Sequence, residues 1–298
     1  TCALPIWRMD AGVDLSRTVR KGKYRYIRNY MPHKIWGQYI EYLWKAPSMP
    51  SWENAYNKKQ LNAVQSAFWE SKPFEELYDC EADPHNIYNL AHNESYEGIL
   101  EQMRMSLDNW QVATNDLGFI PEPMIEEISK TISLYEWAKG DRYPLVKILE
   151  TASAAASGDT KTLPLLMERL RDKNAVVRYW AATGCRILKT KAQAAKPLLL
   201  EMANHDDEIS VRNVAAEALY YLGEQKIAVE VLSRSVSSPD IMIRVQSLNI
   251  LQQFGQDALP VLPLAQKILD IDPKRSEYDV SAAKGFIRAM EYYKSNGK

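Results

Sequence analysis

Three copies of one short pattern follow one another in the second half of the chain. In each copy an aliphatic residue precedes an arginine, and an apolar residue stands ten positions after it; the arginines are Arg178, Arg212 and Arg244. They lie 34 and 32 residues apart, and an acidic turn and an apolar stretch precede each one. Self-similarity at this period indicates stacked helical pairs, because one such pair cannot bury its apolar face alone.

This pattern resembles HEAT repeats, in which each unit is two antiparallel helices with an Asp and an Arg near the inner helix. The period is shorter than the roughly 40–47 residues usual for that family, so we expect compact units. Residues 144–156 resemble an incomplete first unit, and 260–290 a degenerate last one with Ser281 at the arginine position. We expect each arginine to bind helix-end carbonyls or an Asp of the next unit.

The first part of the chain has a different character. Residues 14–30 predict a β-hairpin that turns at 21–23, and 75–79 predict a short strand. Helices are expected from Ser51 to about residue 65, with Ser51 as N-cap, and over 95–114. Prolines at 121 and 123 indicate a linker.

Several motifs in this first part occur in a fixed order. They are RTVR at 17–20, YRYIRNY at 24–30, ELYD at 76–79, Asp-Pro at 83–84 and Asn-Leu-Ala at 89–91. Together they resemble the C-terminal subdomain of type I, formylglycine-dependent sulfatases, and the hairpin resembles the branch of heparan N-sulfatases and bacterial glycan sulfatases. The resemblance implies an α+β subdomain, a small antiparallel sheet with helices, followed by an all-α HEAT-repeat solenoid.

The expected organisation has four parts. Residues 1–8 are expected to be a non-native scar, 9–120 the sulfatase-like subdomain, 121–142 a linker and 143–295 the solenoid. The scar is inferred from the sequence TCALPI, which can be read as a translated sequencing adapter.

The chemistry of that family needs residues that this sequence does not carry. The nucleophile is a formylglycine made from Cys or Ser in C/S-x-P-x-R, and none of the three cysteines, Cys2, Cys80 and Cys185, lies in that motif. The paired aspartates that hold Ca²⁺ belong to a catalytic domain that the resemblance places before this segment. We therefore expect the chain alone to be inactive, and a parent protein that needs Ca²⁺ and formylglycine and works in the periplasm or is secreted.

Two residues are candidates for contact with a sulfated glycan. His33 follows the hairpin on a loop, and Arg28 lies near it in sequence; imidazole and guanidinium groups suit sulfate or carboxylate groups. The simpler alternative for His33 is a surface or packing histidine. The aromatic residues between Trp36 and Trp69 suit either a sugar-binding wall or, as the favoured interpretation, packing against the catalytic domain.

Composition limits the other functional classes. The formal net charge is −1, so no overall field attracts nucleic acid. No apolar run approaches the roughly 20 residues of a membrane span, and the cysteine and histidine spacings match no zinc motif. Hydrolysis of sulfate esters or N-sulfates by the parent is the leading hypothesis.

Two alternatives stay open for the repeats. They form either a non-catalytic interaction module that binds a protein on their concave face, or a support for the sulfatase-like part or for self-association. A role like that of phycobilin lyases, which some short HEAT repeats have, is disfavoured by the sulfatase-like half.

Overall fold

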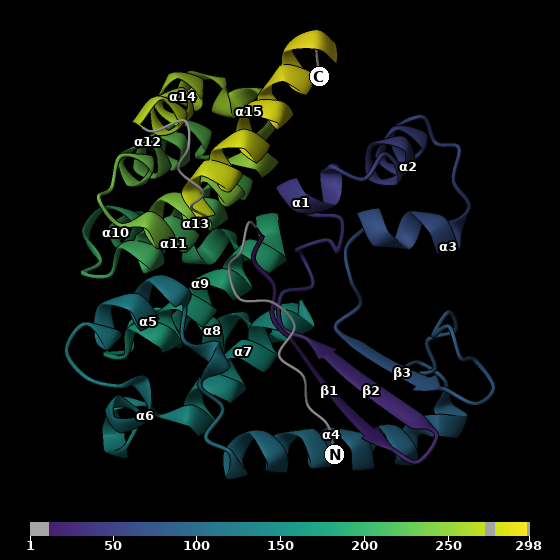
Figure 1. Ribbon diagram of the computed structural model, residues 1–298. Coiled ribbons are helices and arrows are strands. Elements are labelled where there is room, and N and C mark those ends of the chain that lie inside the picture. Colours follow the sequence, from purple (N-terminus) through teal and green to yellow (C-terminus); the bar gives the residue numbers. More distant parts are fainter. Residues whose placement is uncertain (1–11, 272–277, 297–298) are drawn as a thin grey trace.

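The computed structural model describes residues 12–271 and 278–296. It is mostly helical, with one small antiparallel sheet (Figure 1). The predicted scar over residues 1–8 lies outside the described part of the chain. Within that part, no helix combines the length and apolar character needed to cross a membrane.

The sheet has three strands in the order β1 (Ser16–Lys21), β2 (Tyr24–Asn29) and β3 (Glu75–Asp79). The predicted hairpin and third strand are confirmed, and the hairpin turns at Gly22, whose φ of 59° suits a residue without Cβ. Helix α4 (Glu97–Ala113) packs on the sheet. Their shared core comprises Val19, Tyr26, Leu77, Leu100, Met103 and Leu107.

The segment between β2 and β3 holds three short helices. They are α1 (Glu41–Trp44), α2 (Ser48–Asn57) and α3 (Ala63–Ser66). The prediction of one helix capped by Ser51 was wrong, because α2 begins at Ser48 and Lys59 takes a positive φ of 56° just after it ends. A new helix then starts at Asn62, whose side chain forms a capping box with Gln65.

Residues 121–142 also form helices, α5 (Glu122–Ser129) and α6 (Leu134–Trp137). Met124 of α5 is buried in the same core as the repeats. The proposed boundaries between the parts stay a prediction.

The repeats form a stack of helical pairs. Their helices are α7 (Leu145–Ser157), α8 (Leu163–Arg169), α9 (Ala175–Leu188), α10 (Lys196–His205), α11 (Ile209–Tyr221), α12 (Gln225–Val236), α13 (Ile241–Leu251), α14 (Leu262–Ile271) and α15 (Tyr278–Asn296). Short 3₁₀ segments occur at Ala67–Trp69, Glu94–Tyr96, Leu117–Phe119, Gly140–Arg142, Thr160–Thr162, Lys189–Ala195 and Gln252–Val261. The three repeat arginines fall on α9, α11 and α13.

Two of these arginines join successive repeats as expected. Arg178 donates two hydrogen bonds to Asp206, at 2.7 and 2.8 Å, and one to the carbonyl of Asp172 at 2.9 Å. Arg244 donates to Asp279 at 2.7 Å and to the carbonyl of Ser238. The expectation that each arginine binds helix-end carbonyls or an Asp of the next unit is confirmed for Arg178 and Arg244, which bind both.

Arg212 departs from this pattern. Its Nε is buried without a hydrogen-bond partner among the described residues. Asp206, the partner of Arg178, stands six positions before the arginine of the next repeat, Arg212. The corresponding partner of Arg212 would stand six positions before Arg244, where the sequence has the uncharged Ser238. Asp240, four positions before Arg244, instead caps α13 by accepting hydrogen bonds from two backbone N–H groups. The middle arginine therefore lacks its acidic partner.

The second helices of the repeats face the first part of the chain. Trp180 of α9 donates its indole N–H to the carbonyl of Phe119 at 2.9 Å. The Tyr30 ring packs edge-on against both, with centroid distances of 4.6 Å to Phe119 and 6.3 Å to Trp180. Contacts also join α13 to α5 and α15 to α1, whereas α10, α12 and α14 lie on the side away from α1 (Figure 1). One continuous core runs from Leu15 to Met290. The inner face of the repeats is thus packed against residues of the same chain.

Candidate functional site

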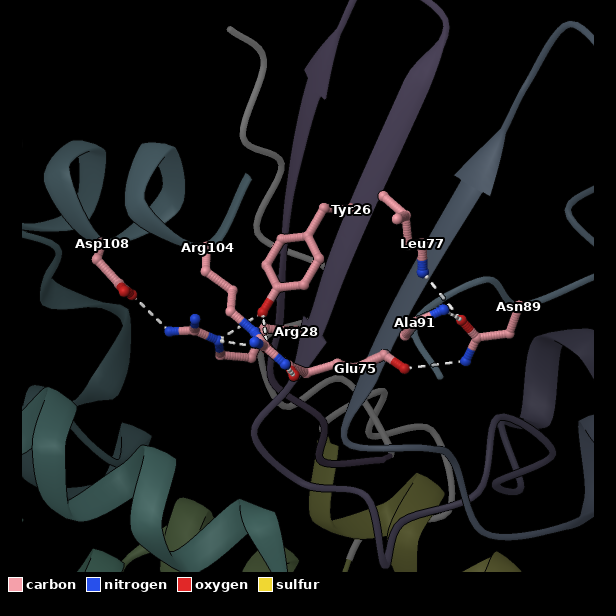
Figure 2. A network of polar contacts seen from close by, with 8 residues as sticks. All are labelled: Tyr26, Arg28, Glu75, Leu77, Asn89, Ala91, Arg104 and Asp108. Atoms are coloured by element: carbon pink, nitrogen blue, oxygen red, sulfur yellow. Dashed lines mark hydrogen bonds and ion pairs between the residues drawn. The ribbon is translucent and has the colours of Figure 1, made fainter. Parts of the chain in front are cut away.

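Arg28 lies in a buried polar network between β2, β3 and α4, shown in Figure 2. Its Nε donates to the Tyr26 hydroxyl at 2.9 Å, and its guanidinium binds Asp108. Glu75 accepts from Tyr26 and from Arg104. Burial raises the pKa of Glu75, but the hydrogen bonds from Arg104 and Tyr26 outweigh it, so the pKa is lowered and the carboxylate stays ionised.

Asn89 completes this network on the far side of β3 (Figure 2). Its side-chain oxygen accepts from the N–H groups of Leu77 and Ala91, and its amide donates to the carbonyl of Glu75. The ELYD strand and the Asn-Leu-Ala motif are therefore joined by hydrogen bonds. With Arg28 only 6% exposed and already paired, its proposed contact with a glycan stays a prediction.

His33 lies apart from Arg28, on the loop that follows β2. It lines a cavity of about 600 Å³ between residues 33–57 and helices α13 and α15, whereas Arg28 lines a different one. The Nδ1 of His33 is buried and has no hydrogen-bond partner among the described residues. Burial, and then the charges of Arg186, Lys34, Lys72 and Lys189, lower the pKa of His33 well below its usual value. The imidazole is therefore neutral.

A buried ion cluster lies beside His33 and joins the two halves of the chain. Glu217 of α11 accepts from Lys34 at 3.0 Å and from Arg186 of α9 at 3.1 Å. Burial lowers the pKa of Lys34. Burial also opposes ionisation of Glu217, but Lys34 and Arg186 outweigh it and its pKa is lowered. Two cations therefore share one carboxylate here.

The opposite wall of the cavity is aromatic. Tyr39 and Trp44 lie with their ring centroids 5.1 Å apart, and the guanidinium carbon of Arg288 sits 5.5 Å from each centroid. Arg288 also forms an ion pair with Glu53 of α2, which ties α15 to the loop. A Cβ at Gly285 would lie 2.6 Å from a Tyr39 ring carbon, so this approach requires a glycine.

Several of these residues are not recognisable as site residues from the sequence. Asn249, Gln253 and Arg288 come from the repeats and reach the cavity only through the fold. Glu217 could have been found, because it is a charged residue flanked by alanines on a helix face that the repeat pattern predicts to be buried.

No described residues offer a metal site of three or more His, Cys, Asp or Glu side chains. The Ca²⁺ implied by the resemblance remains an expectation for the parent. Cys185 is buried, which raises the pKa of its thiol to about 12, and Cys80 is half-buried. Cys2 lies outside the described residues.

Comparisons with known proteins fit this two-part organisation. Residues 133–220 match the family model described as HEAT repeats. The chain is 38% identical over 116 residues to an ulvan-active sulfatase of Formosa agariphila, which covers 39% of this chain and 20% of that protein. A second ulvan-active sulfatase of that organism is 31% identical over 109 residues, covering 37% and 20%. The chain spans about a fifth of the length of the curated relatives it matches. One part is thus similar to sulfatases and another to HEAT repeats.

Proposed function

We propose that this chain is the C-terminal part of a sulfatase that hydrolyses sulfate esters or N-sulfates on glycans. The observation that carries the proposal is the 38% identity to an ulvan-active sulfatase over 116 residues. A catalytic domain outside this sequence would supply the formylglycine and the Ca²⁺ site, since C/S-x-P-x-R does not occur around any of the three cysteines. The finer assignment is to the branch resembling heparan N-sulfatases, with a parent in the periplasm or secreted.

Within such a parent, the repeats act as a support for the sulfatase-like part. The shared core and the Lys34–Glu217 pair support this role, because they fix the loop that carries His33 against α11. The alternative, an interaction module that binds a protein on its concave face, has less support. That face already contacts Phe119, Lys34 and α5 of the same chain.

Sulfate release tests the proposal directly. Two proteins are compared: the proposed parent with its catalytic domain, here the longer product, and this chain alone. Each is incubated with an aryl sulfate and with sulfated glycans, and free sulfate is measured by ion chromatography. We expect release only by the longer product, and its loss when the nucleophile of C/S-x-P-x-R is replaced by alanine. Release by this chain alone would refute the location of the nucleophile. A longer product that releases no sulfate from any of these substrates would overturn the sulfatase assignment.

A further inference from the structure

We propose that the cavity between residues 33–57 and helices α13 and α15 binds an anionic oligosaccharide, and that the repeats supply part of the binding site. This deepens the proposed function and rests on it for the identity of the ligand as a substrate. The cavity measures about 600 Å³, within the range of roughly 300–1,000 Å³ typical of ligand sites. Its lining combines aromatic rings with amide and charged side chains, the mixture expected where a ligand has both ring faces and many hydroxyls.

Several cations lie around the end of the cavity at His33. Four cations lie close enough to lower the pKa of His33: Arg186, Lys34, Lys72 and Lys189. The carboxylates that pair with them are Glu217, which binds Lys34 and Arg186, and Asp14, which binds Lys72. Of these cations, Lys34 lines the cavity, where Arg288 adds a second positive charge. The lining also holds Glu53, which pairs with Arg288, and Glu291. Lys34 and Arg288 are therefore the groups that attract a sulfate or carboxylate of the ligand.

Two residues that line this cavity each carry a buried polar atom without a hydrogen bond to the described part of the chain. These atoms are the Nδ1 of His33 and the Nδ2 of Asn249. Unpaired buried polar atoms are rare in folded proteins and each costs free energy. An amide N–H donates to a hydroxyl, sulfate or carboxylate oxygen, and a neutral imidazole nitrogen accepts from a hydroxyl or donates to an anionic oxygen. A hydroxylated anion satisfies these atoms when the His33 and Asn249 side chains turn toward the cavity.

The remaining walls suit sugar rings. Tyr39 and Trp44 form one wall, and Tyr292 of α15, 48% exposed, lines the same cavity. Flat aromatic faces pack against the C–H faces of sugar rings, while Gln252 and Gln253 of the segment after α13 add amides for hydroxyl groups. Arg288 stands over both aromatic rings and is 41% exposed, so it can pair with a second anionic group.

Binding is measured on this chain as it stands, so that no catalytic step is involved. The probe is a size-fractionated heparin hexasaccharide, compared by isothermal titration calorimetry with the same hexasaccharide after chemical desulfation. We expect binding of the sulfated probe and at least fivefold weaker binding of the desulfated one. Absence of binding, or equal binding of both probes, would overturn the proposal.

Variants locate the binding site. Arg288→Ala is expected to weaken binding of the sulfated probe about tenfold, the effect of one lost charge-assisted hydrogen bond. The matched control is Arg20→Ala, which removes the same charge from the exposed end of β1 and is expected to change affinity less than twofold. Equal losses in the two variants would mean charge attraction without a site and would overturn the proposal.

Arg288→Ala removes the ion-pair partner of Glu53 and can therefore disturb folding. A second variant tests the site without this risk. Asn249→Ala removes an amide whose Nδ2 has no hydrogen bond to the described residues and whose Oδ1 accepts one from Gln252 at 3.3 Å, so the fold should persist while binding weakens. Unchanged binding in a folded Asn249→Ala protein would remove the repeats from the site. The outcomes are separable from the proposed function: failure of binding here leaves aryl sulfate hydrolysis by the longer product untouched, and failure of that hydrolysis leaves this binding measurement intact.

Discussion

The guanidinium of Arg178 binds both carboxylate oxygens of Asp206, at 2.7 and 2.8 Å, across the boundary between two repeats. The Arg178 side chain is 15% exposed and that of Asp206 is 5% exposed. Arg178→Ala therefore leaves a buried carboxylate without its partner, and we expect it to lower the free energy of unfolding by about 2–3 kcal/mol. Urea denaturation followed by circular dichroism measures the change.

Arg212→Ala is the matched control for Arg178→Ala. Arg212 occupies the same repeat position, but its Nε has no hydrogen-bond partner in the part of the chain that the structure describes. We expect a loss of less than about 1 kcal/mol, from packing of the side-chain stem. Equal losses at the two positions would contradict the ion-pair account of the repeat pattern.

The missing partner of Arg212 can be restored. Ser238 stands where the preceding repeats carry Asp172 and Asp206, and it lines a cavity together with Arg212. Ser238→Asp is therefore expected to stabilise the protein by about 1 kcal/mol, since the new carboxylate meets an unpaired guanidinium. The gain should vanish in the Ser238→Asp, Arg212→Ala double variant. A gain that survives there comes from some other contact.

Glu217 carries the ion cluster that joins the two halves of the chain. Glu217→Gln leaves Lys34 and Arg186 buried without a counter-charge, and we expect it to lower the free energy of unfolding by about 3–5 kcal/mol. Glu224→Gln is the control, because Glu224 pairs with Lys196 near the surface and its loss should cost at most about 1 kcal/mol. Similar midpoints in urea for both variants would refute a dominant role for the cluster.

His33 is expected to make stability depend on pH in the weakly acidic range. Its pKa is lowered in the folded protein, so below about pH 6.5 the unfolded chain takes up a proton that the folded chain does not. The folded state therefore loses stability as the pH falls, by up to about 1.4 kcal/mol per pH unit. The free energy of unfolding measured at about pH 7.5 and 5.5 should differ less in His33→Gln than in the natural sequence. His85→Gln, at an exposed site, should leave the difference as it is.

Gly118 permits a close approach that a methyl group blocks. A Cβ there would lie 1.9 Å from a guanidinium nitrogen of Arg17, which is 2% exposed and binds Asp116 at 2.7 and 2.8 Å. Gly118→Ala is expected to cost about 2 kcal/mol or more. Gly98→Ala in α4 meets nothing within 4 Å and should leave thermal stability unchanged or slightly higher. A neutral Gly118→Ala would mean that Arg17 can move aside.

Local patterns predicted much of the fold. The hairpin and the strand at Glu75–Asp79 follow from residues close together in sequence, and the Arg178–Asp206 tie follows from the repeat pattern. The start of α2 was missed because Ser48 and Ser51 are both acceptable beginnings for a helix. The unpaired state of Arg212 was missed because an acidic residue near the right place, Asp240, serves instead as a helix cap.

The candidate site was less predictable, since it depends on contacts between distant residues. His33 was selected for its place after the hairpin, but the sequence could not show that it meets Asn249 and Arg288 at one cavity. Arg28 and His33 are close in sequence, but they line different cavities. The strand directs Arg28 towards Asp108, while the following loop carries His33 to the repeats.

The contact between Lys34 and Glu217 joins residues 183 positions apart. An ordinary array of repeats can gain or lose a unit, because each unit touches only its neighbours. Here a unit inserted between α9 and α11 would carry Glu217 away from both Lys34 and Arg186. The contacts of the first part of the chain therefore fix the number of repeats between the helices that it touches. Insertions and deletions of whole units are tolerated only outside that part of the array.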